Sequence, residues 1–162
     1  MNKTLIRYSV ILGSLLICVF LINSIWPITD QNIYLSNFLF FGVIGFTLIS
    51  YYRQPTGLVS YFDLVKRSLL IAFLGGIIVS LFFIVYVNFI HQSYFEEIAS
   101  LEVEKMNRHG MDQNSTRRTL RIIGVARKYH IKELSLIFST LIRTLALSLI
   151  FGPIFINQKK II

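Results

Sequence analysis

The chain has 162 residues, of which 54% are hydrophobic and 15% are charged, and its formal net charge is +8. Soluble domains carry about 25% charged residues, so this composition is typical of a membrane protein. In a soluble protein the positive charge would suggest nucleic-acid binding, but here the basic residues flank apolar segments, where they contact anionic head groups and set the topology. We therefore expect no nucleic-acid partner and a single membrane domain over residues 1–162.

The first apolar segment covers residues 8–26 and follows Lys3 and Arg7. In a helix this length rises about 28 Å, close to the ~30 Å thickness of the hydrocarbon core. The segment is longer than the apolar part of a signal peptide, which has about 7–15 residues, and no small-residue cleavage site follows it. We predict a retained membrane helix. Its Cys18 is the single cysteine of the chain and cannot form an internal disulfide.

Two further apolar segments cover residues 34–52 and 68–90. The first of them is followed at once by Arg53 and a turn-like Gln-Pro-Thr-Gly sequence. Before the second, Ser60 and Asp63 resemble a capping box, so we expect a helix to begin next to Ser60. Each segment is long enough to cross the hydrocarbon core as a helix.

The long polar stretch of the chain covers residues 93–133 and holds eight of the sixteen Lys and Arg residues and six of the eight acids. Ser93 and Glu96 resemble a second capping box, which predicts a helix that ends before Gly110. Asp112 then suits the N-cap of another helix. The sequence therefore predicts a helical hairpin as an insert between the third and fourth apolar segments.

The second insert helix, which we expect to end near Lys132, is amphipathic at about 100° per residue. Its basic side is expected to face lipid head groups and consists of Arg117, Arg118, Arg121, Lys128 and Lys132. We expect this helix to rest on the outer leaflet, with the first insert helix covering it. Surface charge pairs contribute only about 0–1 kcal/mol each, so apolar contacts must hold the hairpin. The expected contact residues are Phe95, Ile98 and Leu101 on the first helix, and Leu120, Ile123 and Tyr129 on the second. Two separately solvated helices are the alternative.

The fourth apolar segment covers residues 134–156 and contains one charge, Arg143. A charge near the centre of a membrane helix costs about 2.5–3.5 kcal/mol on insertion scales, so such a residue is a functional candidate. The four apolar segments contain no Asp or Glu, which leaves Asn88 and His91 as the expected polar partners of Arg143. The alternative is that this long side chain snorkels to the membrane surface.

Small and hydroxylated residues recur every four positions along the third and fourth segments. They are Ala72, Gly76 and Ser80 in the third segment, and Thr140, Thr144, Ser148 and Gly152 in the fourth. Each set lies on one helix face, and small residues at this spacing allow close helix contact in lipid. Small residues are also common in membrane helices generally, so packing and composition both remain open as explanations.

The expected topology follows from the positive-inside rule. The connection over residues 27–33 has no Lys or Arg, whereas Lys3 and Arg7 precede the first segment and Lys159 and Lys160 lie near the end of the chain. We therefore expect both termini in the cytoplasm and the insert outside, although the eight basic residues of the insert oppose this orientation.

This layout resembles the bacterial membrane family called domain of unknown function 4199. The resemblance rests on Gly57-Leu58-Val59-Ser60-Tyr61-Phe62 before the third segment, on the Glu-rich helix that breaks at His109-Gly110-Met111-Asp112, and on the Gly-bearing fourth segment that closes on lysines. The second insert helix departs from the family pattern, because it is strongly basic here. The resemblance implies a bacterial inner-membrane protein and supplies no activity and no site residues.

Motifs for catalysis and metal binding are absent from the sequence. The three histidines, His91, His109 and His130, lack the spacing of metal ligands, and no GxSxG sequence is present. We therefore predict no enzyme activity, no catalytic residue, no metal and no cofactor.

The sequence thus predicts an all-α polytopic membrane protein with four transmembrane helices and an extramembrane helical hairpin between the third and fourth. The leading function is a non-catalytic inner-membrane accessory or scaffold protein that contacts membrane lipids, a membrane-protein partner or a second copy of itself. The alternative is a small transporter or channel subunit that uses Arg143 and the stripe of Thr140, Thr144 and Ser148.

Overall fold

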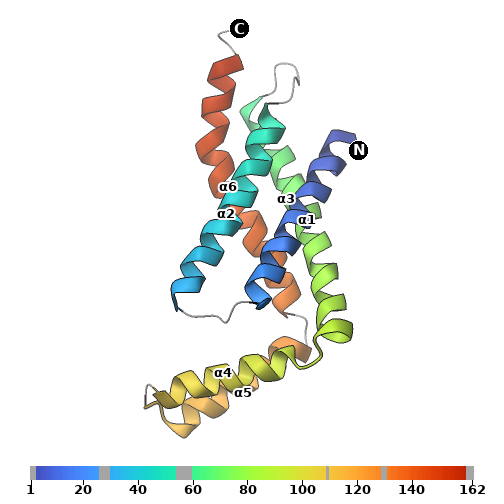
Figure 1. Ribbon diagram of the computed structural model, residues 1–162. Coiled ribbons are helices and arrows are strands. Elements are labelled where there is room, and N and C mark those ends of the chain that lie inside the picture. The colour runs from blue at the N-terminus through green and yellow to red at the C-terminus, as the bar shows by residue number, and fades with distance from the viewer. Residues whose placement is uncertain (1–2, 26–29, 54–59, 109, 129–130, 160–162) are drawn as a thin grey trace. The chain divides into compact units, whose positions relative to one another are not determined.

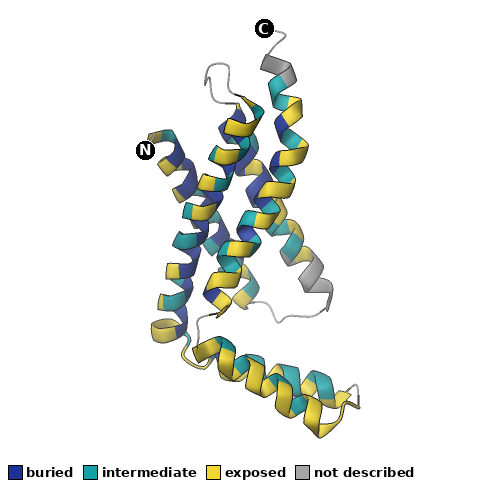
Figure 2. Cartoon of the chain, turned by 180° about the vertical axis from the view of Figure 1, so that it is seen from behind, coloured by how far each residue is buried: buried dark blue, intermediate teal, exposed yellow. Residues whose placement is uncertain are grey.

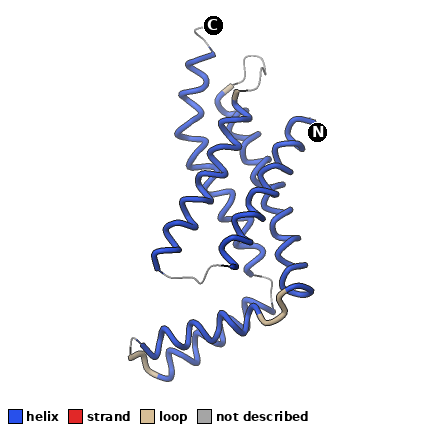
Figure 3. The backbone as a smooth tube through the Cα atoms, in the orientation of Figure 1, coloured by secondary structure: helices blue, strands red, loops and turns tan. Residues whose placement is uncertain are grey.

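The computed structural model describes residues 3–25, 30–53, 60–108, 110–128 and 131–159, and these residues form helices and short turns without a strand (Figures 1 and 3). The elements in chain order are α1 (Lys3–Ile25), α2 (Asp30–Tyr52), α3 (Tyr61–Val85), the π-helix η1 (Tyr86–Ile90), α4 (Tyr94–Arg108), α5 (Gln113–Lys128) and α6 (Ile131–Lys159). The all-α prediction is therefore confirmed for the described part of the chain.

Three of these helices are long and apolar enough to cross a membrane. Their spanning stretches are Lys3–Ser24, Tyr61–Ile90 and Ile131–Ile156. In α2 the apolar stretch found among the described residues is shorter and covers Asn37–Tyr52. These helices indicate a membrane protein, whose hydrocarbon-facing backbone groups are satisfied inside each helix.

The predicted apolar segments coincide with helices along the chain. Segment 8–26 lies in α1 except for Trp26, which is outside the described residues, and segment 34–52 lies in α2. Segment 68–90 covers most of α3 together with η1, and segment 134–156 lies within α6. Long helices form here because a nonpolar solvent leaves backbone N–H and C=O groups no other partner.

Helix α3 begins beside Ser60, as the local sequence predicts. The Leu64 amide donates to the Ser60 carbonyl at 3.0 Å, which closes the first turn. Asp63 lies in that first turn, where the positive end of the helix dipole favours an acidic side chain.

The chain divides into two compact units. The core unit comprises Met1–Val79 and Leu136–Ile162, and the insert unit comprises Ser80–Ser135. In the core unit, α1, α2 and the first part of α3 share one apolar cluster, and side chains of α6 pack against it. Figure 2 shows that buried residues lie on the sides of these helices that face one another.

Two glycines in the core unit allow α3 and α6 to approach closely. A Cβ atom added to Gly76 would lie 3.2 Å from the Cα atom of Ile137. A Cβ atom added to Gly152 would lie 2.6 Å from Cε2 of the Tyr61 ring, which is closer than real Cβ contacts. Helix contact in lipid depends on this kind of packing, because the lipid tails are as apolar as the side chains.

In the insert unit, α4 and α5 lie side by side and are joined at Gly110 (Figure 1). Gly110 has a φ of 65°, and the Met111 amide donates to the Met106 carbonyl at 3.0 Å. This is the glycine-ended helix terminus that the sequence predicts. Asp112 caps the next helix, because its Oδ1 accepts from the Ser115 amide at 3.0 Å.

The predicted end of the second insert helix is wrong. Helix α5 ends at Lys128 and α6 begins at Ile131, so Lys132 belongs to the first turn of α6. Glu133 also lies in this first turn, where the helix dipole favours an acid. The Glu133 backbone carbonyl accepts from the Ser80 hydroxyl at 2.8 Å, which ties this turn to α3 within the insert unit.

Candidate functional site

Arg143 is held by three residues from the first half of α2. Its Nη2 atom donates to Oδ1 of Asn37 at 2.8 Å. Its guanidinium carbon lies 5.0 Å from the centroid of the Phe40 ring and 5.5 Å from that of Phe41. The side chain is half-buried in the core unit, and among the described residues its hydrogen-bond and cation–π partners are one amide and two aromatic rings. A guanidinium over aromatic faces gains about 0.5–2 kcal/mol per contact.

Asn88 and His91 were the partners expected for Arg143, but both form hydrogen bonds with other groups. The Asn88 side-chain amide donates to the Ile84 carbonyl of its own helix at 2.8 Å. His91 contacts Tyr86 and Glu97. The sequence prediction overlooked Asn37, although a polar side chain inside an apolar helix is the signal that could have found it. Asn37 and Arg143 lie 106 positions apart, which hid the pairing.

The stripe of small and hydroxylated residues on α6 faces the interior of the core unit. Thr140, Thr144, Ser148 and Gly152 are all buried. The Thr140 hydroxyl donates to the Leu136 carbonyl at 2.8 Å, a bond within the helix. No described residue accepts from the Thr144 hydroxyl. The stripe therefore packs against neighbouring helices of the unit and does not face lipid.

The corresponding stripe on α3 is also buried. Ala72 and Gly76 are buried in the core unit, and Ser80 is buried in the insert unit. One turn earlier on the same side of the helix, Ser68 forms a hydrogen bond of 2.8 Å with the Tyr52 hydroxyl of α2. The buried hydroxyl groups of Ser68 and Ser80 are thus hydrogen-bonded to neighbouring helices, as burial in an apolar medium requires.

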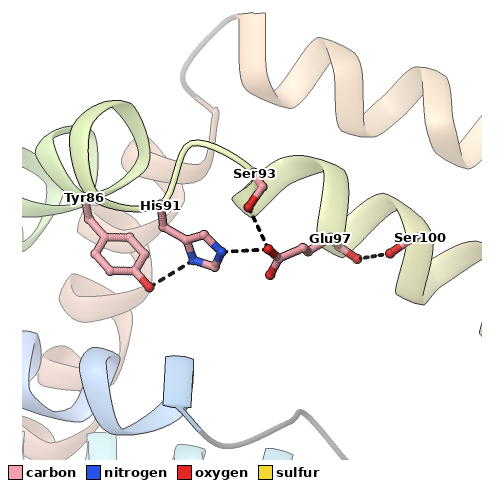
Figure 4. Close-up of polar contacts among 5 residues, drawn as sticks. All are labelled: Tyr86, His91, Ser93, Glu97 and Ser100. Carbon is pink, nitrogen blue, oxygen red and sulfur yellow. Dashed lines mark hydrogen bonds and ion pairs between the residues drawn. The ribbon is translucent and has the colours of Figure 1, made fainter.

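A chain of hydrogen bonds links η1 to the start of α4 (Figure 4). The Tyr86 hydroxyl lies 3.1 Å from Nδ1 of His91, and Nε2 of His91 lies 2.8 Å from Oε1 of Glu97. The Ser93 hydroxyl donates to the same Glu97 oxygen at 2.7 Å. Tyrosine, imidazole and carboxylate are therefore connected in one line within the insert unit.

The π-helical turn places His91 in this position. The His91 amide donates to the Tyr86 carbonyl at 2.7 Å, a bond that spans five residues where an α-helix spans four. The chain then turns, and the amides of Glu96 and Glu97 both donate to the Ser93 carbonyl at 2.9 Å. The capping prediction chose the wrong acid, because Ser93 pairs with Glu97 and not with Glu96.

Two hydrogen bonds favour the ionised form of Glu97. The hydrogen bond from Ser93, and after it the one from His91, hold the pKa of Glu97 below its ordinary value of 4.5. The His91 ring also lies edge-on to Tyr86 and Tyr94, with centroids 5.6 and 5.9 Å away. Burial raises the pKa of Tyr94 to about 12, so this phenol stays neutral. The arrangement can hold a proton on Nε2 of His91 while Nδ1 accepts from Tyr86.

The basic residues of α5 lie on an exposed face. Arg117, Arg118, Arg121 and Lys128 are all exposed, and none of the residues of α5 is buried. Arg127 lies on another face, with Nη1 4.0 Å from Oε1 of Glu96 and its guanidinium carbon 5.8 Å from the Phe95 ring centroid. Lys132, which we assigned to the same face, is an exposed residue of α6.

The apolar contacts between α4 and α5 differ in part from those expected. Phe95 is buried, and Ile98 and Ile123 are half-buried. Leu101 and Leu120 are exposed, so they contribute less to the pairing than predicted. Tyr129 lies outside the described residues, as do His109 and His130. Among the side chains that the structure describes, no three His, Cys, Asp or Glu residues are grouped so that they could hold a metal ion.

Comparison with known proteins identifies a family. No curated protein and no solved structure matches the chain at a significant level. A family model described as protein of unknown function (DUF4199) matches residues 7–155. The matched range extends from α1 into the last turns of α6 and includes both the Arg143 contacts and the hydrogen bonds of His91. The chain therefore belongs to the DUF4199 family.

Proposed function

We propose that this chain is a non-catalytic accessory or scaffold protein of the bacterial inner membrane, which acts through contacts with lipids and with other membrane proteins. The observation that carries the proposal is the exposed basic face of α5. A helix that leaves all its residues at least partly exposed and presents Arg117, Arg118 and Arg121 on one side is suited to a charged surface.

The proposed topology has four spans, with both termini in the cytoplasm and the α4–α5 hairpin outside the membrane. Helix α2 supports a count of four spans, because the predicted apolar segment 34–52 lies within it and rises about 28 Å, close to the ~30 Å of the hydrocarbon core. The positive charges Lys3 and Arg7 at the start of α1 and Lys159 at the end of α6 support the orientation.

Lipid head groups are the proposed partner of α5. Each Lys or Arg near an anionic membrane surface contributes about 1 kcal/mol, so three arginines are enough to hold a helix that lies on the membrane. At about 100° per residue these three arginines fall within one arc of about 100°. The exposed Ile122 and Val125 supply apolar surface for the region between head groups and acyl chains.

Hydrogen exchange tests this proposal on the full chain in lipid nanodiscs. We expect residues 113–128 to exchange more slowly in discs that contain phosphatidylglycerol than in discs of phosphatidylcholine alone. The triple variant Arg117→Glu, Arg118→Glu, Arg121→Glu should lose this difference. The matched variant with Lys at the three positions keeps the charge and the helix propensity, so it should retain the difference. Equal exchange of the parent protein in both discs would refute the lipid contact.

A small transporter or channel subunit is the second candidate. The half-buried Arg143 favours it, since intramembrane charges mark substrate and ion pathways. Anion flux in proteoliposomes that is lost in Arg143→Leu and kept in the α5 triple variant would support this candidate over the accessory protein.

A further inference from the structure

We propose that Arg143 and Asn37 bind the phosphate of an anionic phospholipid, with the acyl chains lying on the aromatic surface beside them. This site belongs to the core unit and involves no residue of α5, so it is independent of the head-group contact proposed for α5, although it rests on the proposed four-span topology. Its residues come from the first half of α2 and from the middle of α6.

The first argument is the charge balance at Arg143. Among the described side chains, its hydrogen-bond partner is the Asn37 amide oxygen, its cation–π partners are Phe40 and Phe41, and no carboxylate lies within ion-pair distance. A guanidinium keeps its charge at any physiological pH. A half-buried cation with neutral neighbours alone favours an anion from outside the chain.

The second argument is the number of hydrogen-bond donors. A guanidinium has five N–H groups, and one bond to Asn37 is present. In an apolar medium each donor left without an acceptor is unfavourable by several kcal/mol. Phosphate oxygens can accept two parallel bonds from the planar guanidinium, a geometry that a water molecule cannot reproduce.

The third argument is the depth of the guanidinium. Asn37 lies three residues after the start of the predicted second span at Tyr34, which corresponds to about 4.5 Å along the helix. Arg143 begins nine residues after Leu134, or about 13.5 Å along α6, but its side chain reaches Asn37. Counted from these predicted span starts, the guanidinium lies on the side of the hydrocarbon core where both spans begin, and it lies closer to the head groups than the backbone of Arg143 does.

The surface beside the site favours a lipid over a free anion. Phe38 is 73% exposed and Ile142 is 67% exposed, and they neighbour Asn37 and Arg143 in sequence. Phe41 is itself 41% exposed while its ring contacts the guanidinium. Apolar side chains around a phosphate-binding arginine suit acyl chains, whereas a free phosphate would lose its hydration without compensation there.

Native mass spectrometry of the full chain in detergent tests the site, with phosphatidylglycerol, phosphatidylcholine and inorganic phosphate as probes. We expect the parent protein to retain phosphatidylglycerol in preference to phosphatidylcholine. Loss of charge-assisted hydrogen bonds in Arg143→Leu should lower the retained fraction about tenfold or more. Asn37→Leu should lower it less, because the charge remains. Arg143→Lys should be intermediate, because an ammonium lacks the planar pair of donors.

Two controls separate lipid binding from other causes. Lys66→Leu removes an exposed basic residue of α3 and should not change lipid retention. The Arg143 and Asn37 variants are also compared in the background of the α5 triple variant, which removes the separate lipid contact proposed for α5. A thermal melt of each variant in delipidated detergent shows whether it is folded. If Arg143→Leu does not fold, Asn37→Leu and Arg143→Lys decide the question.

Three results would overturn the site. The first is equal phosphatidylglycerol retention in the parent, Arg143→Leu and Asn37→Leu proteins. The second is displacement of the lipid by millimolar inorganic phosphate, which would assign the site to a free anion. The third is a dimer that forms only in the parent protein and excludes the lipid, which would assign Arg143 to a second copy of the chain.

Discussion

Nε2 of His91 lies 2.8 Å from Oε1 of Glu97, across the turn that separates η1 from α4. The Ser93 hydroxyl shares that carboxylate oxygen at 2.7 Å, and Tyr86 holds the other side of the imidazole. Polar side chains therefore tie the first turn of α4 to the end of η1. The Glu97 carboxylate accepts the hydrogen bonds from both His91 and Ser93.

Acid should release this connection. The pKa of Glu97 is lower in the folded protein than its ordinary 4.5, first because of Ser93 and then because of His91. A carboxyl with a depressed pKa contributes stability above the unfolded pKa, and this contribution is lost as the pH falls through the folded pKa. We expect the amides of residues 94–97 to lose hydrogen-exchange protection as the pH falls below 4.5.

Two glutamine variants check the acid response. Glu97→Gln should show weak protection at these amides at every pH, whereas Glu104→Gln, which removes an exposed acid paired with Arg108, should keep the parent response. If Glu97→Gln retains the pH dependence, another group is responsible.

Gly110 should tolerate alanine poorly, in contrast to Gly124. Gly110 has a φ of 65°, and left-handed backbone disfavours any residue with a Cβ by about 1–2 kcal/mol. Gly124 lies within α5 with open space around it, and alanine there should stabilise the helix by up to ~1 kcal/mol. Urea unfolding of the insert unit, monitored by hydrogen exchange, should therefore have a lower midpoint in Gly110→Ala and a higher midpoint in Gly124→Ala than in the parent protein. A shift in the same direction would contradict the assigned turn.

Gly152 should resist enlargement because of Tyr61. A Cβ at Gly152 would lie 2.6 Å from the ring, so Gly152→Ala requires the ring to move, and overpacking of this kind costs about 1–3 kcal/mol. Gly42→Ala is the matched control, since nothing lies near that position. The melting temperature in detergent should fall for Gly152→Ala and stay unchanged for Gly42→Ala. Adding Tyr61→Leu should restore part of the loss, and a double mutant without restoration would argue against this contact.

Labelling with an impermeant thiol reagent should reveal the topology. In a Cys18→Ser background, a cysteine at Asn114 should react on intact cells, because α5 is proposed to lie outside. A cysteine at Gln158 should react only after the cells are opened. Labelling of Gln158 without labelling of Asn114 would reverse the proposed orientation.

Features governed by neighbours in sequence were predictable. The start of α3 beside Ser60, the glycine turn at Gly110 and the cap at Asp112 each depend on groups within five positions. The apolar segments were visible because a membrane helix needs an uninterrupted apolar run of fixed length. Family membership was also recognisable from local patterns, and the matched residues 7–155 agree with it.

Tertiary structure decided which polar groups meet. The sequence suggested two partners for Arg143 near the end of the third segment, Asn88 and His91, whereas the packing of α2 against α6 brings Asn37 to it. The sequence also predicted that Ser93 pairs with Glu96, whereas in the structure the turn after the π-helix places Glu97 within hydrogen-bond distance of Ser93. A charge within an apolar helix must find an acceptor somewhere, and the sequence determines that need. The identity of the acceptor depends on which helices pack together and how each is rotated, and chain order does not determine that arrangement.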